Sequence, residues 1–333
     1  MRIQRLTLDE WVDVFPASGF EWAHRPDVLR VIDAHATGEL QLYGGFKGEQ
    51  PVGLLPAVVR TELFATAVLS PPPGLGIPRL GPILLPTSPK RSKQEKVNRE
   101  FTTGILDAID AHEPLTLVGF ACPAAYADPR PYIWAGFDVE PRFTYRLDLD
   151  GRTPEDVKGS FSSSIRREMR DAEAAGITVS LRGMDGTREV YTAHANRRNE
   201  QGDGYPVSWE YTRDLVAALG EHVRTYVAET PEGEFAGGLT VLYSNEEGYY
   251  IQGGTRAGIS DVSPNALLHW HAIEDILTDP VLSSVTRYDL GNATIESLSR
   301  YKSKYGGELV SQYLVTSGRL MTLARRAYEL ITY

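Results

Sequence analysis

Two stretches of the chain decide its fold, YYIQGGTR at residues 249–256 and SPNALLHW at residues 263–270. The first begins as a strand and ends in a glycine-bearing loop. The second opens a helix, with Ser263 as N-cap and Pro264 at the first helical position. Such a helix start presents backbone N–H groups and the positive end of the helix dipole, which suits a phosphate or carboxylate. Every strand-to-helix junction of an α/β protein shares these features, so an ordinary structural junction is the alternative.

The strand–turn–strand pattern occurs twice along the chain. GEQPVGL at 48–54 aligns with GEFAGGL at 233–239, and each copy lies between two strand-like runs. The same order then follows in both halves: a helix (95–111 or 266–277), a strand (115–120 or 286–290), and two short antiparallel strands (136–149 or 305–316). The shared order favours a duplication over two unrelated sets of hairpins. The sequence therefore predicts a mixed α/β fold in two similar halves.

A domain boundary is predicted near residue 150. TPED at 153–156 reads as a helix start, and a second helix at 164–175 is stopped by Gly176 before a strand at 177–181. A chain of 333 residues also suits two domains of about 150 residues each. We expect an N-terminal domain at 1–150 and a C-terminal domain at 151–333.

Composition excludes several classes of protein. The chain has 44 acidic and 34 basic side chains, a net charge of −10, which argues against a generally basic nucleic-acid coat protein but not against a local basic patch. The single cysteine, Cys122, permits neither an intrachain disulfide nor a cysteine-rich zinc site. Residues 1–11 lack the apolar core of a signal peptide, and the weakly charged stretch 63–86 contains six prolines, too many for a spanning helix. We expect a soluble, cytoplasmic protein.

Two basic clusters are candidates for binding or catalysis. Arg166 and Arg170 share a helix face and form either an anion clamp or a solvated charged surface. Lys302 and Lys304 lie in RYKSKYG at 300–306, where a lysine could stabilise an oxyanion or bind a phosphate, or simply end a helix.

No metal site is predicted. His269 and His271 are two residues apart on a helix and so do not share a face. A polar or core histidine is the better interpretation of His269.

The second half of the chain resembles the FemAB/FemX peptidyltransferase group of the wider GNAT superfamily. The resemblance rests on FSSSIRREMRDAEAAG at 161–176, NALLHWHAI at 265–273, and YDLG at 288–291 followed by the lysine motif at 300–306. The first half fits more loosely, through GLLP at 53–56. Within the group, the overall pattern looks closest to uncharacterised archaeal GNAT-like proteins.

This resemblance implies two tandem GNAT-like domains and transfer of an acyl or aminoacyl group to an amine. It assigns Lys302 to oxyanion stabilisation. Tyr301 or Tyr305 is then a candidate for proton transfer. Donor phosphates would lie at the helix start, near Arg256, Ser263, Asn265 and Ala266, and an anionic portion of a substrate near Arg166 and Arg170. Further candidates for the cleft are Gln252, Asp289, Asn292, Lys304 and His269.

The donor and the role of the first half stay open. RAGISD at 256–261 stands where the group's acetyl-CoA loop is expected, so the donor is either an acyl-CoA such as acetyl-CoA or an aminoacyl-tRNA. The acceptor would be a small-molecule or peptide amine. The first half has IWAG at 133–136 where the second half has its lysine, which indicates a structural or acceptor-binding role. The alternative for the whole chain is a non-catalytic tandem module that binds an anionic metabolite, a cell-surface precursor or a protein.

Overall fold

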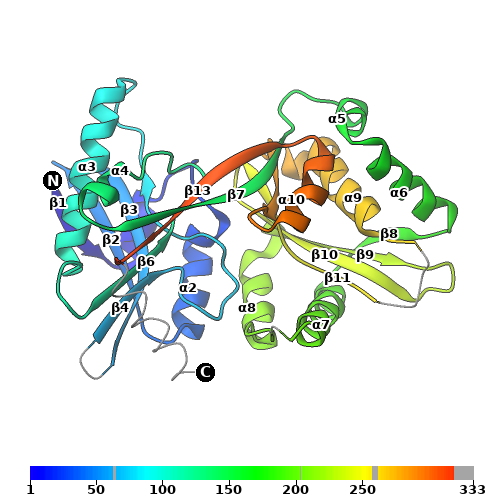
Figure 1. Cartoon of the computed structure of the whole chain (residues 1–333), viewed down its shortest axis with the longest axis horizontal. Coiled ribbons are helices and arrows are strands. Elements are labelled where there is room, and N and C mark those ends of the chain that lie inside the picture. The colour runs from blue at the N-terminus through cyan, green and yellow to red at the C-terminus, as the bar shows by residue number, and fades with distance from the viewer. Residues whose placement is uncertain (63–64, 203, 257–261, 319–333) are drawn as a thin grey trace. The chain divides into compact units, whose positions relative to one another are not determined.

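The computed structural model describes residues 1–62, 65–202, 204–256 and 262–318 (Figure 1). The chain divides into two compact units. One unit comprises Met1–Arg142 and resumes at Ser311, and the other comprises Phe143–Val310. None of the described helices is long and apolar enough to cross a bilayer.

The first unit follows the order that the repeat predicts. Its elements are β1 (Arg2–Leu6), α1 (Leu8–Val14), η1 (Trp22–His24), α2 (Pro26–His35), β2 (Glu39–Lys47), β3 (Gln50–Glu62), β4 (Ala65–Ser70), β5 (Ile83–Leu84), α3 (Arg91–Ala108), β6 (Thr116–Ala121) and α4 (Arg130–Trp134). Strand β7 (Asp138–Asp148) then runs into the second unit.

The second unit begins with two helices that have no counterpart in the first. These are α5 (Pro154–Ser160) and α6 (Ser163–Ala174), and Thr153 caps α5 as predicted, because its Oγ1 accepts from the backbone N–H of Asp156. The remaining elements are β8 (Thr178–Arg182), α7 (Met184–Glu200), α8 (Trp209–Leu219), η2 (Gly220–His222), β9 (Val223–Glu229), β10 (Phe235–Tyr243), β11 (Glu247–Thr255), α9 (Asn265–Thr278), η3 (Pro280–Leu282), β12 (Arg287–Asn292), α10 (Glu296–Lys302), η4 (Ser303–Tyr305) and β13 (Glu308–Thr316).

The closing part of each half differs from the prediction. Two short antiparallel strands were expected at 136–149 and again at 305–316, and each region is instead one long strand, β7 or β13. The physical reason is that the glycines Gly136, Gly306 and Gly307 precede the strands instead of dividing them, so no turn interrupts either run. Each strand therefore continues from one unit into the other.

The strands of the two units follow the same order within the sheet, with the last strands exchanged. The first is β1-β2-β3-β4-β6-β13 and the second is β8-β9-β10-β11-β12-β7. In both, the third and fourth strands are antiparallel, the fourth and fifth are parallel, and the sixth strand is antiparallel to the fifth. This confirms the predicted α/β class with mixed sheets.

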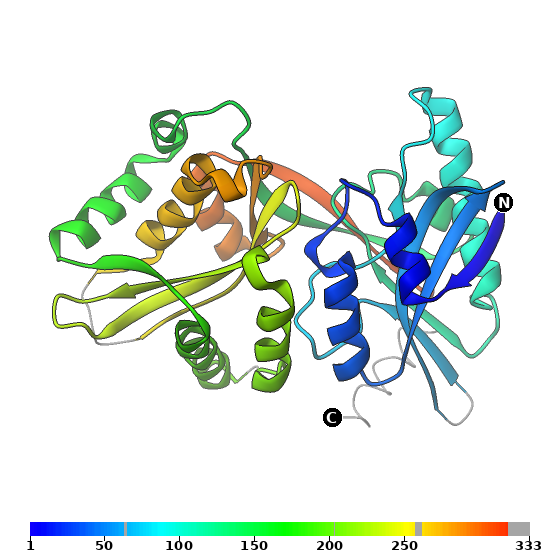
Figure 2. The same cartoon turned by 180° about the vertical axis from the view of Figure 1, so that it is seen from behind.

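Helices cover both faces of the sheet in the second unit (Figures 1 and 2). On one face Ala266, Leu268 and Ile273 of α9 join a core with Tyr226 and Val241 of the strands. On the other face α7 packs so closely that a Cβ built on Gly238 would lie 2.4 Å from Val190 Cγ2. The sheet therefore separates an α9 face from an α7 face.

Candidate functional site in the second unit

The parallel strands β11 and β12 stop pairing part-way along their length. Their register runs only from Glu247 opposite Arg287 to Tyr249 opposite Asp289, although β11 continues to Thr255. We call the region beyond Tyr249 and Asp289 the split. Backbone groups of β11 beyond this point are not held by β12, so the split offers a place where a substrate chain can lie against the strand.

A β-bulge in β11 lies next to the split. The register with β10 steps from Gln252 to Tyr250, which leaves Ile251 as the extra residue. Tyr250 and Gln252 consequently point to opposite faces of the sheet. Tyr250 packs against His269 of α9 with ring centroids 4.8 Å apart, whereas Gln252 donates to Tyr205, beyond α7, at 2.8 Å. The structure thus places Gln252 on the face opposite His269.

Lys302 lies between the two strands at the split. It ends α10, its side chain is 8% exposed, and Nζ donates to the backbone oxygen of Asn292 on β12 at 2.8 Å. The same atom is 5.8 Å from the ring centroid of Tyr250 on β11. Burial lowers the pKa of Lys302 to about 8, although the negative charge of Asp289 acts in the opposite direction. One N–H group is committed to Asn292, and an ammonium group has three.

Aromatic side chains surround Lys302 and His269. The ring of His269 packs edge-on against those of Tyr250, Tyr288 and Tyr305, and Nδ1 lies 2.8 Å from the Tyr288 hydroxyl. Burial, and then the charge of Lys302, lower the pKa of His269 to about 3, so this histidine is neutral at physiological pH. His269 lies four residues into α9, about 6 Å along the axis from the helix start. The ring of Tyr250, which lies beside both His269 and Lys302, connects α9 with the lysine.

Tyr301 and Tyr305 form a hydrogen-bonded pair on the α9 face. Their hydroxyl oxygens are 2.9 Å apart, and Tyr305 also packs against Phe161 with ring centroids 5.3 Å apart. Burial raises the pKa of both tyrosines, and the carboxylate of Glu168 on α6 adds to the rise. Both hydroxyls therefore keep their protons at neutral pH and can relay a proton only through concerted transfer.

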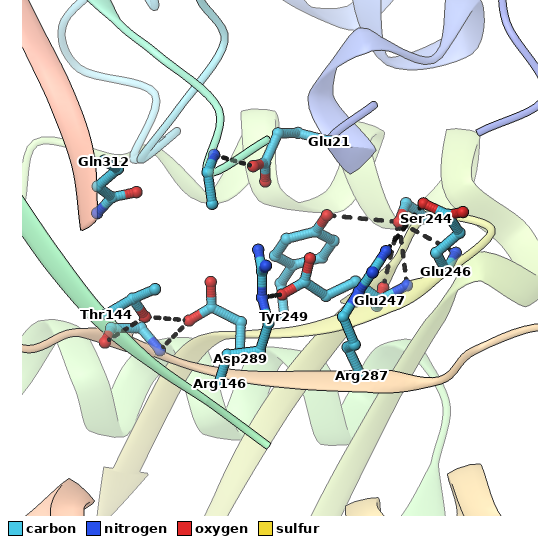
Figure 3. Close-up of polar contacts among 12 residues, drawn as sticks. Glu21, Thr144, Arg146, Ser244, Glu246, Glu247, Tyr249, Arg287, Asp289 and Gln312 are labelled. Atoms are coloured by element: carbon cyan, nitrogen blue, oxygen red, sulfur yellow. Dashed lines mark hydrogen bonds and ion pairs between the residues drawn. The ribbon is translucent and has the colours of Figure 1, made fainter. Parts of the chain in front are cut away.

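Asp289 is buried beside the split and accepts several hydrogen bonds. Its Oδ1 accepts from the backbone N–H of Gly291 at 2.6 Å and from the hydroxyl of Thr144 on β7. Figure 3 shows Thr144 and Asp289 facing each other, with the Arg146–Glu247 ion pair nearby at 2.6 Å. Thr144 could not be identified from the sequence, because its contact with Asp289 spans 145 residues of chain.

The start of α9 differs by one residue from the prediction. Pro264, not Ser263, is the N-cap, and the helix begins at Asn265, whose N–H lies 3.4 Å from Ser263 Oγ. Ser263 was expected there because Pro favours the first helical position. Ser263 and Arg256 are exposed and Ala266 is buried, while the predicted donor-loop stretch at 257–261 lies outside the described residues.

The other basic candidates have different surroundings from Lys302. Arg166 of α6 is half-buried and donates to the backbone oxygen of Gly159 at 3.0 Å, whereas Arg170 is exposed. Lys304 is half-buried in η4, and its backbone oxygen accepts from Ser162 at 2.8 Å. The structure therefore brings together Lys302, Asn292, Asp289, His269, Tyr301 and Tyr305.

A groove of about 1280 Å³ on the α7 face was not predicted. Its lining includes Arg188 and Arg197 of α7 and Arg256 at the end of β11. The charge of Arg197 also lowers the pKa of Tyr250, against the larger upward effect of burial. Its arginines are far apart in the sequence and lie among acidic residues, so the sequence did not indicate that they form a cluster. Among the described residues, no group of three or more His, Cys, Asp and Glu side chains could hold a metal ion.

Comparison with known proteins finds a similarity in the region that contains these contacts. Residues 159–303 match a family model described as an acetyltransferase (GNAT) domain. The matched region includes the split, α9 and Lys302. No curated protein sequence matches the chain significantly.

Solved structures show that the tandem arrangement as a whole is a known fold. FemX is similar with a TM-score of 0.68 at 12% identity, over 94% of this chain and 97% of that chain. The C-terminal domain (DUF2156) of a candidate lysylphosphatidylglycerol synthetase from Agrobacterium fabrum is similar with a TM-score of 0.59 at 11% identity, over 97% and 94%. A tandem GNAT protein from the clavulanic acid biosynthesis pathway gives 0.53 at 14% identity, over 95% and 97%. The predicted fold of two tandem GNAT-like domains is thereby confirmed.

Proposed function

We propose that the protein is an N-acyltransferase of the GNAT/FemAB type, which transfers an acyl or aminoacyl group from a thioester or ester donor to an amine. The observation that carries the proposal is the placement of Lys302. A buried ammonium group lies where β11 and β12 cease to pair, within the residues that match the GNAT family model. An acyl carbonyl lying in the split would have this cation beside its oxygen.

The proposed reaction requires the protein to position the donor and the acceptor and to stabilise the charge that develops. The acceptor amine attacks the donor carbonyl, a tetrahedral oxyanion forms, and the thiolate or alkoxide leaves, so no covalent enzyme intermediate is required. Lys302 donates a hydrogen bond to the oxyanion, while the backbone oxygen of Asn292 holds the lysine Nζ in place. A single donor of this kind contributes about 3 kcal/mol to the transition state, roughly a hundredfold in rate.

The donor binds with its phosphates at the start of α9. The first N–H groups of a helix have no partner within the helix, and the dipole adds positive potential there. His269 connects this end of α9 to Lys302, so phosphates at Asn265 and an acyl carbonyl at Lys302 fit one extended donor. Acyl-CoA meets this requirement directly, and an aminoacyl-tRNA is the second donor that the proposal allows.

The neutral acceptor amine becomes positively charged at nitrogen when it attacks the carbonyl, and this nitrogen must then lose a proton. Tyr301 and Tyr305 are the candidates, because their hydroxyls form a pair that reaches from Glu168 to the ring of His269. Since Lys302 must carry its proton to stabilise the oxyanion, we expect the rate to fall above about pH 8, the pKa of this lysine.

A product survey tests the proposal. The purified protein is incubated with mixed acyl-CoAs or charged tRNAs and a panel of amines, and new amides are detected by mass spectrometry. We expect an amide from one donor class, and loss of it in Lys302→Met. Transfer by a tRNA donor should fall steeply between low and moderate salt, whereas a CoA donor should show a shallow loss. Tight ligand binding without any product would instead identify a binding module.

A further inference from the structure

Residues 290–292 of β12 lie beyond its pairing with β11 and form an irregular segment of the strand beside β7. The Thr144 hydroxyl, which has one hydrogen to donate, lies within hydrogen-bond distance of both the Asp289 carboxylate and the backbone oxygen of Gly291, the latter at 2.9 Å. On the same strand, the backbone oxygen of Phe143 accepts from Ala293 at 2.8 Å, and the N–H of Phe143 donates to Thr294 Oγ1 at 3.2 Å. The side chain and backbone of one strand thus hold this irregular segment and the two residues after it.

This irregular segment sets the direction of the Asn292 carbonyl. Gly291 has φ of +75°, a conformation that favours glycine, and the register of β12 with β7 shifts between Asp289 and Asn292. A regular strand would point the carbonyl of Asn292 along the ladder. In the irregular segment, it accepts from Lys302 Nζ.

We propose that Thr144 and Asp289 are positioning residues for Lys302, acting through the Gly291–Asn292 segment. The inference deepens the proposed function and rests on it for the role of Lys302. The two residues hold the segment whose carbonyl, at Asn292, accepts from the lysine amine. Strand β7 therefore supplies part of the site in the second unit.

Asp289 has a second effect on the lysine, through its charge. The carboxylate is 1% exposed, and its negative charge raises the pKa of Lys302 against the effect of burial. Removing this charge while keeping the shape of the side chain should make the lysine lose its proton more easily. Replacing a residue that only supports packing would not change the pKa of Lys302 in this way.

The first experiment follows Lys302 directly by NMR. The chain has seven lysines, so a protein labelled with ¹³C at lysine Cε gives a short list of signals, and Lys302→Met identifies the one for Lys302. In Asp289→Asn we expect its titration midpoint to fall by about one pH unit. An unchanged midpoint in a folded Asp289→Asn protein would overturn the role of Asp289.

The second experiment separates positioning from packing. Thr144→Val should lower kcat by about tenfold to a hundredfold, with the KM for the donor within about twofold, because a small displacement of a catalytic group is costly. Thr144→Ser keeps the hydroxyl and should retain the wild-type kcat. Thr240→Val is the matched control, since Thr240 is a buried threonine of the same sheet that bonds to Thr225 on the α7 face.

The outcomes distinguish this inference from the proposed function. If Thr144→Val and Thr240→Val have the same kcat, or if Thr144→Ser is as impaired as Thr144→Val, the positioning role is wrong. The NMR titration needs neither donor nor acceptor. Absence of any transfer by the wild-type protein, with the midpoint still shifted in Asp289→Asn, would therefore overturn the proposed function alone.

Discussion

The two units contain the same pair of parallel strands, and the pairs differ where chemistry would take place. In the first unit, β4 and β6 pair without interruption from Thr66 opposite Thr116 to Ser70 opposite Phe120, where β4 ends. In the second, β11 and β12 pair over a shorter register, and β11 continues to Thr255 paired with β10 but not with β12. The first pair therefore stays hydrogen-bonded to the end of β4, whereas the second pair separates at the split.

The strand beside each pair shows the same contrast. The register between β3 and β4 is regular, whereas the register between β10 and β11 shifts at the bulge next to Tyr250. The helix that follows the fifth strand is α4 in one unit and the lysine-bearing α10 in the other. One fold thus becomes a candidate active site through a bulge, an unpaired strand end and one buried cation.

The largest effect expected from this comparison is on activity. Lys302→Met should lower single-turnover acyl transfer about a hundredfold, because the oxyanion loses its charged donor. Trp134→Ala is the control from α4 in the first unit, where the side chain is 63% exposed, and should leave the rate unchanged. Equal losses in the two variants would show that the contrast between the units has no functional meaning.

The second effect is on the pH dependence of stability. The pKa of Lys302 falls from 10.5 to about 8 on folding, so between these values the unfolded state binds more protons and the free energy of unfolding rises with pH. The full shift corresponds to about 3 kcal/mol. Urea unfolding of wild type and Lys302→Met at pH 7 to 10 should show the wild type gaining stability relative to the variant. Parallel curves would mean that the lysine is not perturbed by burial.

A third effect concerns the wall of the split. A Cβ built on Gly253 would lie 2.5 Å from Tyr250 Oη, so Gly253→Ala must displace the tyrosine ring that covers Lys302. We expect kcat to fall about tenfold. Gly159→Ala serves as the control, because a Cβ there meets no atom within 4 Å. An unaltered kcat in Gly253→Ala would remove Tyr250 from the site.

The smallest effect is expected for the tyrosine pair. Tyr301→Phe removes a hydroxyl that bonds to Tyr305 and lies near Glu168, and should lower the rate several-fold, less than the loss of a direct general base. The steady-state rate at pH 7 with a solvent isotope comparison measures this. A rate and isotope effect equal to those of wild type would exclude the relay.

Local patterns in the sequence predicted the elements well, because helix caps and hairpin turns depend on neighbouring residues. The hairpins, α3, α9, β6 and β12 all appear close to the expected positions. The exchange of β7 and β13 could not be predicted, because strand order depends on pairing between distant segments.

The candidate site was predictable only in part, for the same reason. Lys302 and His269 stand out in the sequence by type and motif. The opposite orientation of Gln252 arises from a bulge, which has no sequence signature here. Thr144 acts across the sheet from Asp289 and is one threonine among many in the sequence.

The most direct test of the account is a crystal structure with a stable donor analogue in which the acyl thioester is replaced by a thioether ketone. We predict that the ketone oxygen lies about 3 Å from Lys302 Nζ, between β11 and β12 of the second unit. An analogue bound in the first unit beside β4 and β6, or one whose ketone is remote from Lys302, would contradict the account.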